Sequence, residues 1–304
     1  MLIERLVADN EVAVFDSMSR DALQHRDISA EDRARIKIYK GDILDAEALG
    51  AALAEFGPTH VVHCAAIAGV DTVIRSPTST LRVNILGTAN LLDALHRLEL
   101  DLKRVVLFST SEVFGQQAFQ SAETSSAVIG PVGEARWTYA VSKLADEHFG
   151  YAYFKEFGMP VTVVRPFNVY GPGQIGEGAL SIFIQRALGN EPIEIHGDGA
   201  QIRAWLYVDD MIEGVTRALT MDEAVGESFN IGNSRAVTTI YGLAQTVTRI
   251  LGSTSTIGFS GRYVADVELR VPDVTKSTEV LGFTATMGLE EGILATAEYY
   301  RRFV

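Results

Sequence analysis

The order of short apolar runs and helical patterns limits the possible folds of this chain most strongly. Strands are expected at 12–16, 36–39, 60–64, 104–108 and 161–164, and helices at 46–56, 80–98 and 139–157. Strands that alternate with helices are typical of a parallel sheet with helices on both faces. The sequence therefore predicts an α/β fold built on a doubly wound parallel sheet.

The regular alternation ends in the middle of the chain. Glycine and proline become frequent between 165 and 192, and the helical and strand patterns return later. We therefore predict a smaller C-terminal domain that interrupts the sheet domain. The sheet domain is expected to comprise 1–166 and 205–232, and the smaller domain 167–204 and 233–304.

Composition excludes several classes of protein. A net charge of -13 in 304 residues argues against a nucleic-acid partner, whose phosphates require a basic face. The apolar stretches are too short to span a bilayer, and the start lacks the pattern of a secretion signal, so we expect no membrane partner. A single cysteine, Cys64, excludes an internal disulfide and fits the cytoplasm; its place after an apolar run predicts a core residue.

Histidines offer no sign of a metal centre. The six in the chain lack the spacing of metal ligands, so no metal site is predicted. His63 lies within an expected strand, and we interpret it as a hydrogen-bonded structural residue.

A polar cluster follows the apolar run 105–108. Thr110, Ser111 and Glu112 would lie at the carboxyl end of a buried strand, where open α/β sheets bind ligands. Tyr139 and Lys143 are four residues apart, so one helix face would carry both. An ammonium group beside a phenol lowers the pKa of the tyrosine from about 10. Tyr139 is therefore a candidate base.

The same spacing occurs a second time, at Tyr151 and Lys155. This copy lies in the middle of a predicted helix among other aromatic residues. We interpret Tyr151 as a packing residue.

Residues after the other strands could bind a dinucleotide. Asp16 ends a strand, where an acid can bind a ribose 2'-hydroxyl and so select NAD over NADP; it could also simply begin a turn. Asp42, beside Ile43, has the same two interpretations, an adenine contact or a turn residue after a glycine. Ala65 and Ala66 are small enough for a cofactor to approach the backbone, or for close helix packing.

Two arginines and an amide could form a second binding cluster. Asn168 follows an expected strand, Arg203 follows a glycine turn, and Arg270 lies near the C-terminus. Guanidinium groups bind phosphate in a bidentate manner, so two of them in an acidic chain suit a diphosphate. Surface ion pairs are the alternative.

Five motifs occur in order along the chain. They are Thr110-Ser111-Glu112-Val113-Phe114-Gly115, Tyr139-x-x-x-Lys143, Arg165-Pro166-Phe167-Asn168, Gln201-Ile202-Arg203 through Asp209-Asp210, and Arg270-x-x-Asp273. These motifs resemble those of the extended short-chain dehydrogenase/reductases, the NAD-dependent sugar-nucleotide epimerases, dehydratases and decarboxylases. The resemblance covers nearly the whole chain and implies a Rossmann-type NAD-binding domain and a sugar-nucleotide-binding domain with the bounds given above.

The resemblance also implies roles for individual residues. Tyr139 would be the catalytic base, with Thr110 as its hydroxyl partner and Lys143 as ribose ligand and pKa modulator. Asn168 and Arg203 would bind the sugar nucleotide, and Arg270 a phosphate or carboxylate. Family members commonly form homodimers through the helices expected here at 80–98 and 139–157.

Glu112 bears on which reaction is expected. Simple 4-epimerases usually lack an acid at this position, and Thr-Ser-Glu looks most like UDP-glucuronate decarboxylases, although GDP-mannose dehydratases share it. A decarboxylase acting through a 4-keto sugar, with Ser111 and Glu112 as catalytic partners, is therefore the first hypothesis. Its alternatives are a 4-epimerase, a 4,6-dehydratase and a non-catalytic sugar-nucleotide-binding relative, in which Glu112 would only cap nearby amides.

One feature departs from the family pattern. Members begin with a strand and a Gly-x-x-Gly-x-x-Gly turn, whereas residues 2–7 of this chain have helical spacing. We therefore expect a sheet that lacks its first strand and a lower affinity for NAD.

Overall fold

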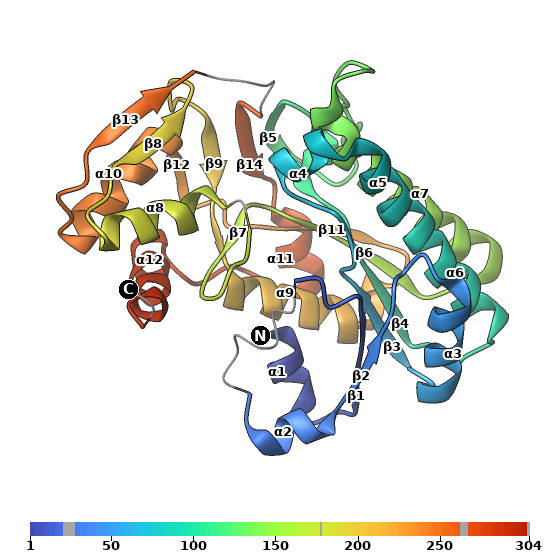
Figure 1. The fold of residues 1–304 in the computed structure, drawn as a ribbon. Helices are drawn as coiled ribbons and strands as arrows, with labels where there is room; N and C mark the ends of the chain where they lie inside the picture. Colours follow the sequence, from blue (N-terminus) through green and yellow to red (C-terminus); the bar gives the residue numbers. More distant parts are fainter. Residues whose placement is uncertain (21–27, 177, 262–266, 303–304) are drawn as a thin grey trace.

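The computed structural model of the chain describes residues 1–20, 28–176, 178–261 and 267–302. The predicted alternation of strands and helices is confirmed (Figure 1). The strands of the larger layer are β1 (Val12–Asp16), β2 (Ile36–Lys40), β3 (His60–His63), β4 (Arg104–Phe108), β6 (Val161–Pro166) and β11 (Ser228–Ile231). The helices around them are α1 (Leu2–Val7), α2 (Ala30–Arg35), α3 (Ala46–Phe56), α4 (Val70–Arg75), α5 (Pro77–Leu81), α6 (Gly87–Arg97), α7 (Thr138–Phe157), α9 (Val208–Thr220) and α11 (Thr275–Leu281).

These strands form two parallel sheets instead of one. The order β11-β6-β4-β3 makes a four-stranded sheet, and β1 pairs with β2 separately. Among the described residues, no strand pairing joins β1 to β3. The interruption lies where the sequence predicted a missing strand.

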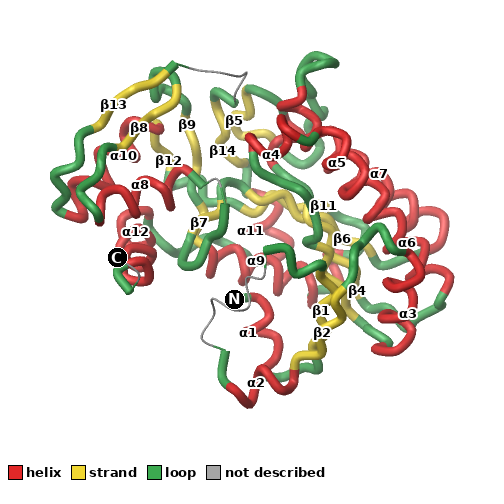
Figure 2. Tube along the Cα trace, viewed as in Figure 1, coloured by secondary structure: helices red, strands yellow, loops and turns green. Residues whose placement is uncertain are grey.

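Helices cover both faces of the four-stranded sheet, as predicted for a doubly wound fold. Val105 and Leu107 of β4 are buried in a core shared with helices α3 and α6. Val106 points to the opposite face and packs into a core with α9. Successive side chains of a strand point to opposite faces, so an unbroken apolar run is required here. Figure 2 shows α6 and α7 on one side of these strands.

Helix α7 carries the first candidate motif and is the longest of the described helices, with 20 residues. It ends at Gly158, whose φ of 68° is left-handed and suits glycine at a helix C-cap. None of the described helices combines the length and apolar character needed to cross a membrane.

The helix expected at 80–98 is divided into three parts. A π-helical turn, Arg82–Leu86, separates α5 from α6. Asn84 is fully buried in this turn and binds the backbone of Ile67, with distances of 2.7 Å to its nitrogen and 3.1 Å to its oxygen. Its amide also donates to the Ser142 hydroxyl of α7 at 2.9 Å. These long-range contacts explain the irregular turn, and such turns often occur at functional sites.

A second layer contains most of the C-terminal elements together with β5 from the first half of the chain. In this layer β5 pairs with β14 in a mixed sheet of order β12-β9-β14-β5. The domain bounds given above stay a prediction. The strands here are β5 (Gln117–Ser121), β7 (Val169–Tyr170), β8 (Ile193–His196), β9 (Ile202–Ala204), β10 (Leu206–Tyr207), β12 (Val237–Thr239), β13 (Ile257–Ser260) and β14 (Leu269–Pro272). Helices α8 (Ala179–Leu188), α10 (Ile240–Leu251) and α12 (Leu289–Tyr300) enclose the apolar core of this layer.

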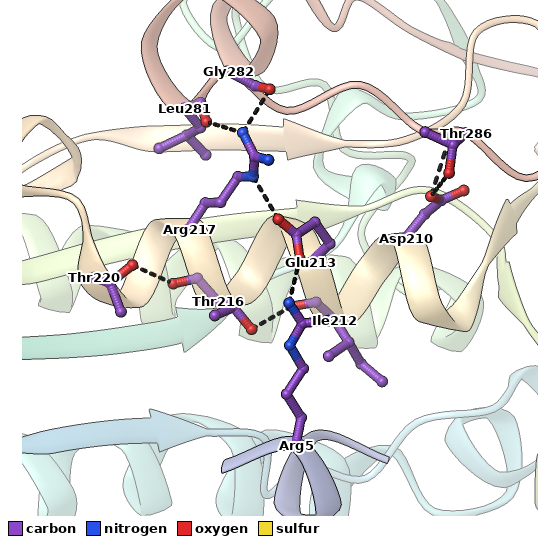
Figure 3. A network of polar contacts seen from close by, with 10 residues as sticks. All are labelled: Arg5, Asp210, Ile212, Glu213, Thr216, Arg217, Thr220, Leu281, Gly282 and Thr286. Carbon is purple, nitrogen blue, oxygen red and sulfur yellow. Dashed lines mark hydrogen bonds and ion pairs between the residues drawn. The ribbon is translucent and has the colours of Figure 1, made fainter. Parts of the chain in front are cut away.

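Helix α9 holds the two layers together through a polar network (Figure 3). Asp210 accepts hydrogen bonds from the Thr286 amide and hydroxyl, both at 3.0 Å. Glu213 accepts from Arg217 at 2.7 Å and from Arg5 of α1 at 2.6 Å. Arg217 also donates to two carbonyls at the end of α11. This helix therefore anchors α1 and the segment that follows α11 against the four-stranded sheet.

Candidate functional site

The carboxyl end of β4 delivers the polar cluster predicted from the sequence. Thr110 begins a short 3-10 turn, and its hydroxyl accepts from the Glu112 amide at 3.2 Å. The same hydroxyl hydrogen-bonds the Tyr139 side chain, which enters from the first turn of α7. Ser111, beside it, is buried. The structure thus brings Thr110, Glu112 and Tyr139 together from two segments that the loop 115–137 separates.

Glu112 lies between arginines. Its carboxylate receives Arg136 in a bidentate manner at 2.6 and 3.2 Å, and Arg270 lies 3.6 Å away. The side chains are 16% exposed for Glu112 and 5% for each arginine. Burial alone would raise the pKa of Glu112, but Arg136, Arg270 and Arg203 together lower it. Glu112 is therefore a carboxylate at neutral pH.

The charges of three arginines, Arg136, Arg270 and Arg203, act on Glu112. Charges that are removed from water interact more strongly than charges at the surface. Guanidinium groups are of the type that binds carboxylates and phosphates.

Arg203 and Arg270 lie side by side because β9 and β14 pair in parallel with these two residues in register. Arg203 donates to the carbonyls of Ile202 at 3.0 Å and Val267 at 2.5 Å. Asn168 has a left-handed φ of 40°, and its side-chain amide donates to the carbonyl of Ala204, the residue after Arg203 on β9, at 2.8 Å. The mixed sheet therefore positions all three residues predicted to bind a sugar nucleotide.

Arg136 was not predicted as a site residue. It lies three residues before Tyr139, and no spacing rule connects it to Glu112, which is 24 residues earlier in the chain. The pairing depends on the fold of the intervening loop. The only sequence signal was a basic residue next to the candidate base.

Lys143 does not lower the pKa of Tyr139 as the sequence predicted. Its ammonium group pairs with Asp146 at 3.0 Å, and both side chains are 2% exposed. The pKa of Tyr139 is raised, first by burial of its hydroxyl and then by the charges of Glu112 and Asp146, while the Thr110 hydrogen bond opposes this rise. The prediction was wrong in this structure because burial disfavours the charged phenolate, and because Asp146, one turn further along α7, pairs with Lys143.

Three predictions near β3 can be compared with the structure. His63 is buried, its Nε2 lies 3.0 Å from the Thr88 hydroxyl, and burial together with Lys143 lowers its pKa to about 3, so the structural interpretation is confirmed. Cys64 is exposed, so its assignment to the core was wrong. It lies at the open end of the strand, immediately before the half-buried Ala65 and Ala66.

Asp16 ends β1, and Asp42 and Ile43 follow β2, the strand that pairs with β1 in a sheet separate from the one that precedes Thr110. Asp16 accepts from the amide two residues on at 2.6 Å, and Asp42 does the same at 2.9 Å. The carbonyl of Ile43 receives the Asn90 amide at 3.0 Å. Both acids thus stabilise turns, the simpler of their two interpretations, and a role in ligand binding stays a prediction.

The second Tyr-x-x-x-Lys motif lies on the surface. Tyr151 is 54% exposed, and the Lys155 ammonium lies 5.2 Å from the centre of its ring. The interpretation of Tyr151 as a packing residue was wrong for this chain. Tyr139 is half-buried beside Glu112, so the structure distinguishes the two copies.

Comparison with known proteins identifies similar chains. A family model described as the NAD dependent epimerase/dehydratase family matches residues 2–232. The UDP-N-acetyl-alpha-D-glucosaminuronate decarboxylase of Bacillus cytotoxicus is 35% identical over 251 residues, which cover 79% of this chain and 76% of that protein. UDP-glucuronic acid decarboxylase 1 of Xenopus tropicalis is 33% identical over 245 residues, which cover 80% of this chain but only 56% of that longer protein.

A solved structure is similar along the whole chain. The UDP-glucuronic acid 4-epimerase of Bacillus cereus, in complex with UDP-glucuronic acid and NAD, superimposes with a TM-score of 0.88. The two sequences are 27% identical, and the match covers 100% of this chain and 95% of the epimerase.

Proposed function

The chain belongs to the NAD-dependent epimerase/dehydratase family, and from this premise we propose that it decarboxylates UDP-glucuronate or a closely related UDP-uronate. Membership makes it an NAD-dependent enzyme that modifies a nucleoside-diphosphate sugar. The observation that carries the finer proposal is the position of Glu112 between Arg136 and Arg270, beside Tyr139. The single cysteine supports a place in the cytoplasm.

The residues at the strand ends fit a dinucleotide. Lys143 and Tyr139 supply donors that suit a ribose, and Asp16 supplies an exposed acceptor at the end of β1. The small side chains of Ala65 and Ala66 leave the backbone accessible between them. When bound, NAD supplies the oxidation at the sugar C4 that makes a ketone and the reduction that removes it.

In this proposal the arginines receive the charges of the substrate. A UDP-uronate has a diphosphate and a carboxylate, and the charges of three arginines act on Glu112. Arg203 and Arg270, adjacent on the mixed sheet, suit the diphosphate, while Arg136 is the guanidinium nearest to Glu112. A neutral sugar has no carboxylate for these arginines to bind.

The chemistry assigns a task to each polar group near Tyr139. Tyr139 takes the proton of the sugar 4-hydroxyl, with Thr110 holding the phenol in place. The bond from C5 to the carboxyl carbon then breaks, its electron pair passes into the C4 carbonyl as an enolate, and carbon dioxide leaves. A proton must return to C5. Ser111, whose hydroxyl carries a proton, is the group that we assign to reprotonating this centre, and Glu112, a carboxylate at neutral pH, is assigned to orienting it.

Product analysis tests this proposal directly. We expect the chain supplied with NAD to convert UDP-glucuronate into a product lighter by the mass of carbon dioxide, read by mass spectrometry. UDP-glucose, UDP-galactose and GDP-mannose serve as matched substrates without the carboxylate. An isomer of unchanged mass would support an epimerase, loss of water from a neutral sugar would support a dehydratase, and no turnover with intact binding would support a non-catalytic relative.

A 4-epimerase is the second candidate, and one observation favours it. The solved structure that superimposes along the whole chain is a UDP-glucuronic acid 4-epimerase. An epimerase must rotate its keto sugar between two transfers of hydride, which needs no acid at C5. Glu112 would then serve only to hold Arg136 and Arg270.

We also propose that two copies of the chain associate through α7 and the π-helical turn. Leu86 is 44% and Val141 40% exposed on these contacting elements, so both apolar side chains are accessible to a second copy. Leu86→Glu is expected to convert a dimer into a monomer, measured by light scattering, because it would bury a charge between the copies. Val237→Glu, at a residue 39% exposed on β12, is the matched control. A wild-type chain that is already monomeric would refute the proposal.

A further inference from the structure

Helix α7 also contains a buried ion pair, Lys143–Asp146, to which the proposed reaction assigns no step. The two side chains are separated by one helical turn, lie 3.0 Å apart and are 2% exposed. Burial raises the pKa of Asp146, and Lys143 opposes that rise. A buried ion pair costs desolvation energy that its own attraction only partly repays. Its position, four residues from the proposed base, therefore suggests a task other than stability.

Groups from several elements face this pair. His63 of β3 is affected by the Lys143 charge, and the Thr88 hydroxyl of α6 acts on Asp146. Glu147 acts on Asp146 from the same helix, but its carboxylate is held by Arg165 at 2.6 Å. Cys64, which follows β3, and Glu112, which follows β4, also act on Tyr139. Asp146 is the only one of the carboxylates named here that contacts Lys143.

The charge of Asp146 acts against Tyr139 as a base. A free ammonium group four residues away would favour the phenolate, but this ammonium is neutralised by its partner. Asp146 itself adds a negative charge that disfavours a second negative charge on Tyr139. Both effects raise the pKa of Tyr139, so its phenol ionises at higher pH.

We propose that Asp146 is a positioning residue that holds Lys143 through its ammonium group and thereby sets the pH range in which Tyr139 acts as a base. The inference rests on the proposed function for the roles of Tyr139 and Lys143. It adds a residue for which the motifs of the sequence gave no role. Release of Lys143 from Asp146 would be the step that prepares the base.

Asp146→Asn tests the inference with little change of shape. Asparagine keeps an oxygen that can accept from Lys143 but removes the negative charge. The acidic limb of the turnover profile is expected to move to lower pH by about one unit, the scale of one charge acting across several Å at an effective dielectric constant of about 20. Asp146→Glu keeps the charge and should restore the wild-type profile.

A second measurement needs neither NAD nor substrate. The absorbance of phenolate is followed against pH in Asp146→Asn and in the double variant Asp146→Asn, Tyr139→Phe, and the difference between the two curves is the titration of Tyr139. The wild type and Tyr139→Phe give the corresponding curve with Asp146 present. We expect Tyr139 to ionise at lower pH in the Asp146→Asn pair than in the wild-type pair. If Asp146→Asn does not fold, Asp146→Ala provides a smaller neutral variant with the same expected direction.

Asp93 provides the matched control. Its carboxylate accepts a hydrogen bond from Tyr153, and burial together with this bond raises the pKa of Tyr153 to about 12. Asp93→Asn should move the titration of Tyr153 but leave the turnover profile unchanged. It thus shows that the optical method detects a lost carboxylate beside a tyrosine.

The outcomes separate the inference from the proposed function. A lower rate in Asp146→Asn, with neither the acidic limb nor the Tyr139 titration moved, would reduce the pair to a structural contact and overturn the inference. A shifted Tyr139 titration without turnover of any sugar nucleotide would support the coupling of Asp146 to the ionisation of Tyr139 but refute the proposed function.

Discussion

Tyr139→Phe is expected to lower turnover by about 10² to 10⁴, the usual contribution of a positioned acid–base group. The phenol lies beside Thr110 and Glu112, and its hydroxyl is the group assigned to the proton of the sugar 4-hydroxyl. Binding of the sugar nucleotide should change little, because the arginines on the mixed sheet are untouched. Steady-state rates and calorimetric binding of UDP-glucuronate measure the two effects separately.

Tyr151→Phe is the control for this experiment. Tyr151 belongs to the same Tyr-x-x-x-Lys spacing on the same helix, but it is 54% exposed. Its hydroxyl moves no proton in the proposed reaction, so turnover should remain near that of the wild type. Equal losses in the two variants would show that Tyr139 is not the base.

Arg136→Met is expected to lower the free energy of unfolding by about 3 to 5 kcal/mol, the usual cost of leaving one partner of a buried ion pair without the other. Glu112 would retain Arg270 at 3.6 Å but lose both of its shorter contacts. Urea denaturation at neutral pH measures the change. The double variant with Glu112→Leu removes both charges and should recover much of the loss, as a thermodynamic cycle would show.

The matched control is Arg249→Met. Arg249 contacts Glu290 at the same 2.6 Å, but the two side chains are 62% and 61% exposed. Exposed pairs contribute about 0 to 1 kcal/mol, so this variant should lose little stability. A similar loss in both variants would contradict the importance of burial at Glu112.

The pH dependence of stability provides a further check on the Glu112–Arg136 pair. The folded chain lowers the pKa of Glu112, so its ionisation stabilises the fold above the unfolded value of about 4.3. This contribution disappears as the pH falls through the lower, folded value. The penalty of Arg136→Met should therefore be complete at neutral pH and shrink in acid.

Local patterns predicted the sheet well because they depend on burial along a strand. The run 105–108 packs on both faces, and the bounds of β4 agree with those expected. The break of the helix expected at 80–98 could not be predicted in this way. It depends on Asn84, whose partners Ile67 and Ser142 are 17 and 58 residues away.

The site was predictable where a motif joins residues close in sequence, and not where charges meet through the fold. Tyr139 was identified from spacing and from the resemblance, and the structure places it beside Thr110. Arg136 could not be found, since only the folded loop brings it to Glu112. Asp146 had a usable signal, because it is three residues after Lys143 on one helix, but only the fold shows that both side chains are buried.

Strand β14 determines when the charge cluster can exist. Arg270 arrives 155 residues after Gly115, whose carbonyl it contacts, and it reaches Glu112 only when β14 inserts between β5 and β9. During synthesis on the ribosome, Glu112 and Arg136 emerge long before their second arginine. The complete cluster of arginines therefore cannot form in a nascent chain until β14 is in place, and tight binding of an anionic ligand to that cluster would indicate a fully folded molecule.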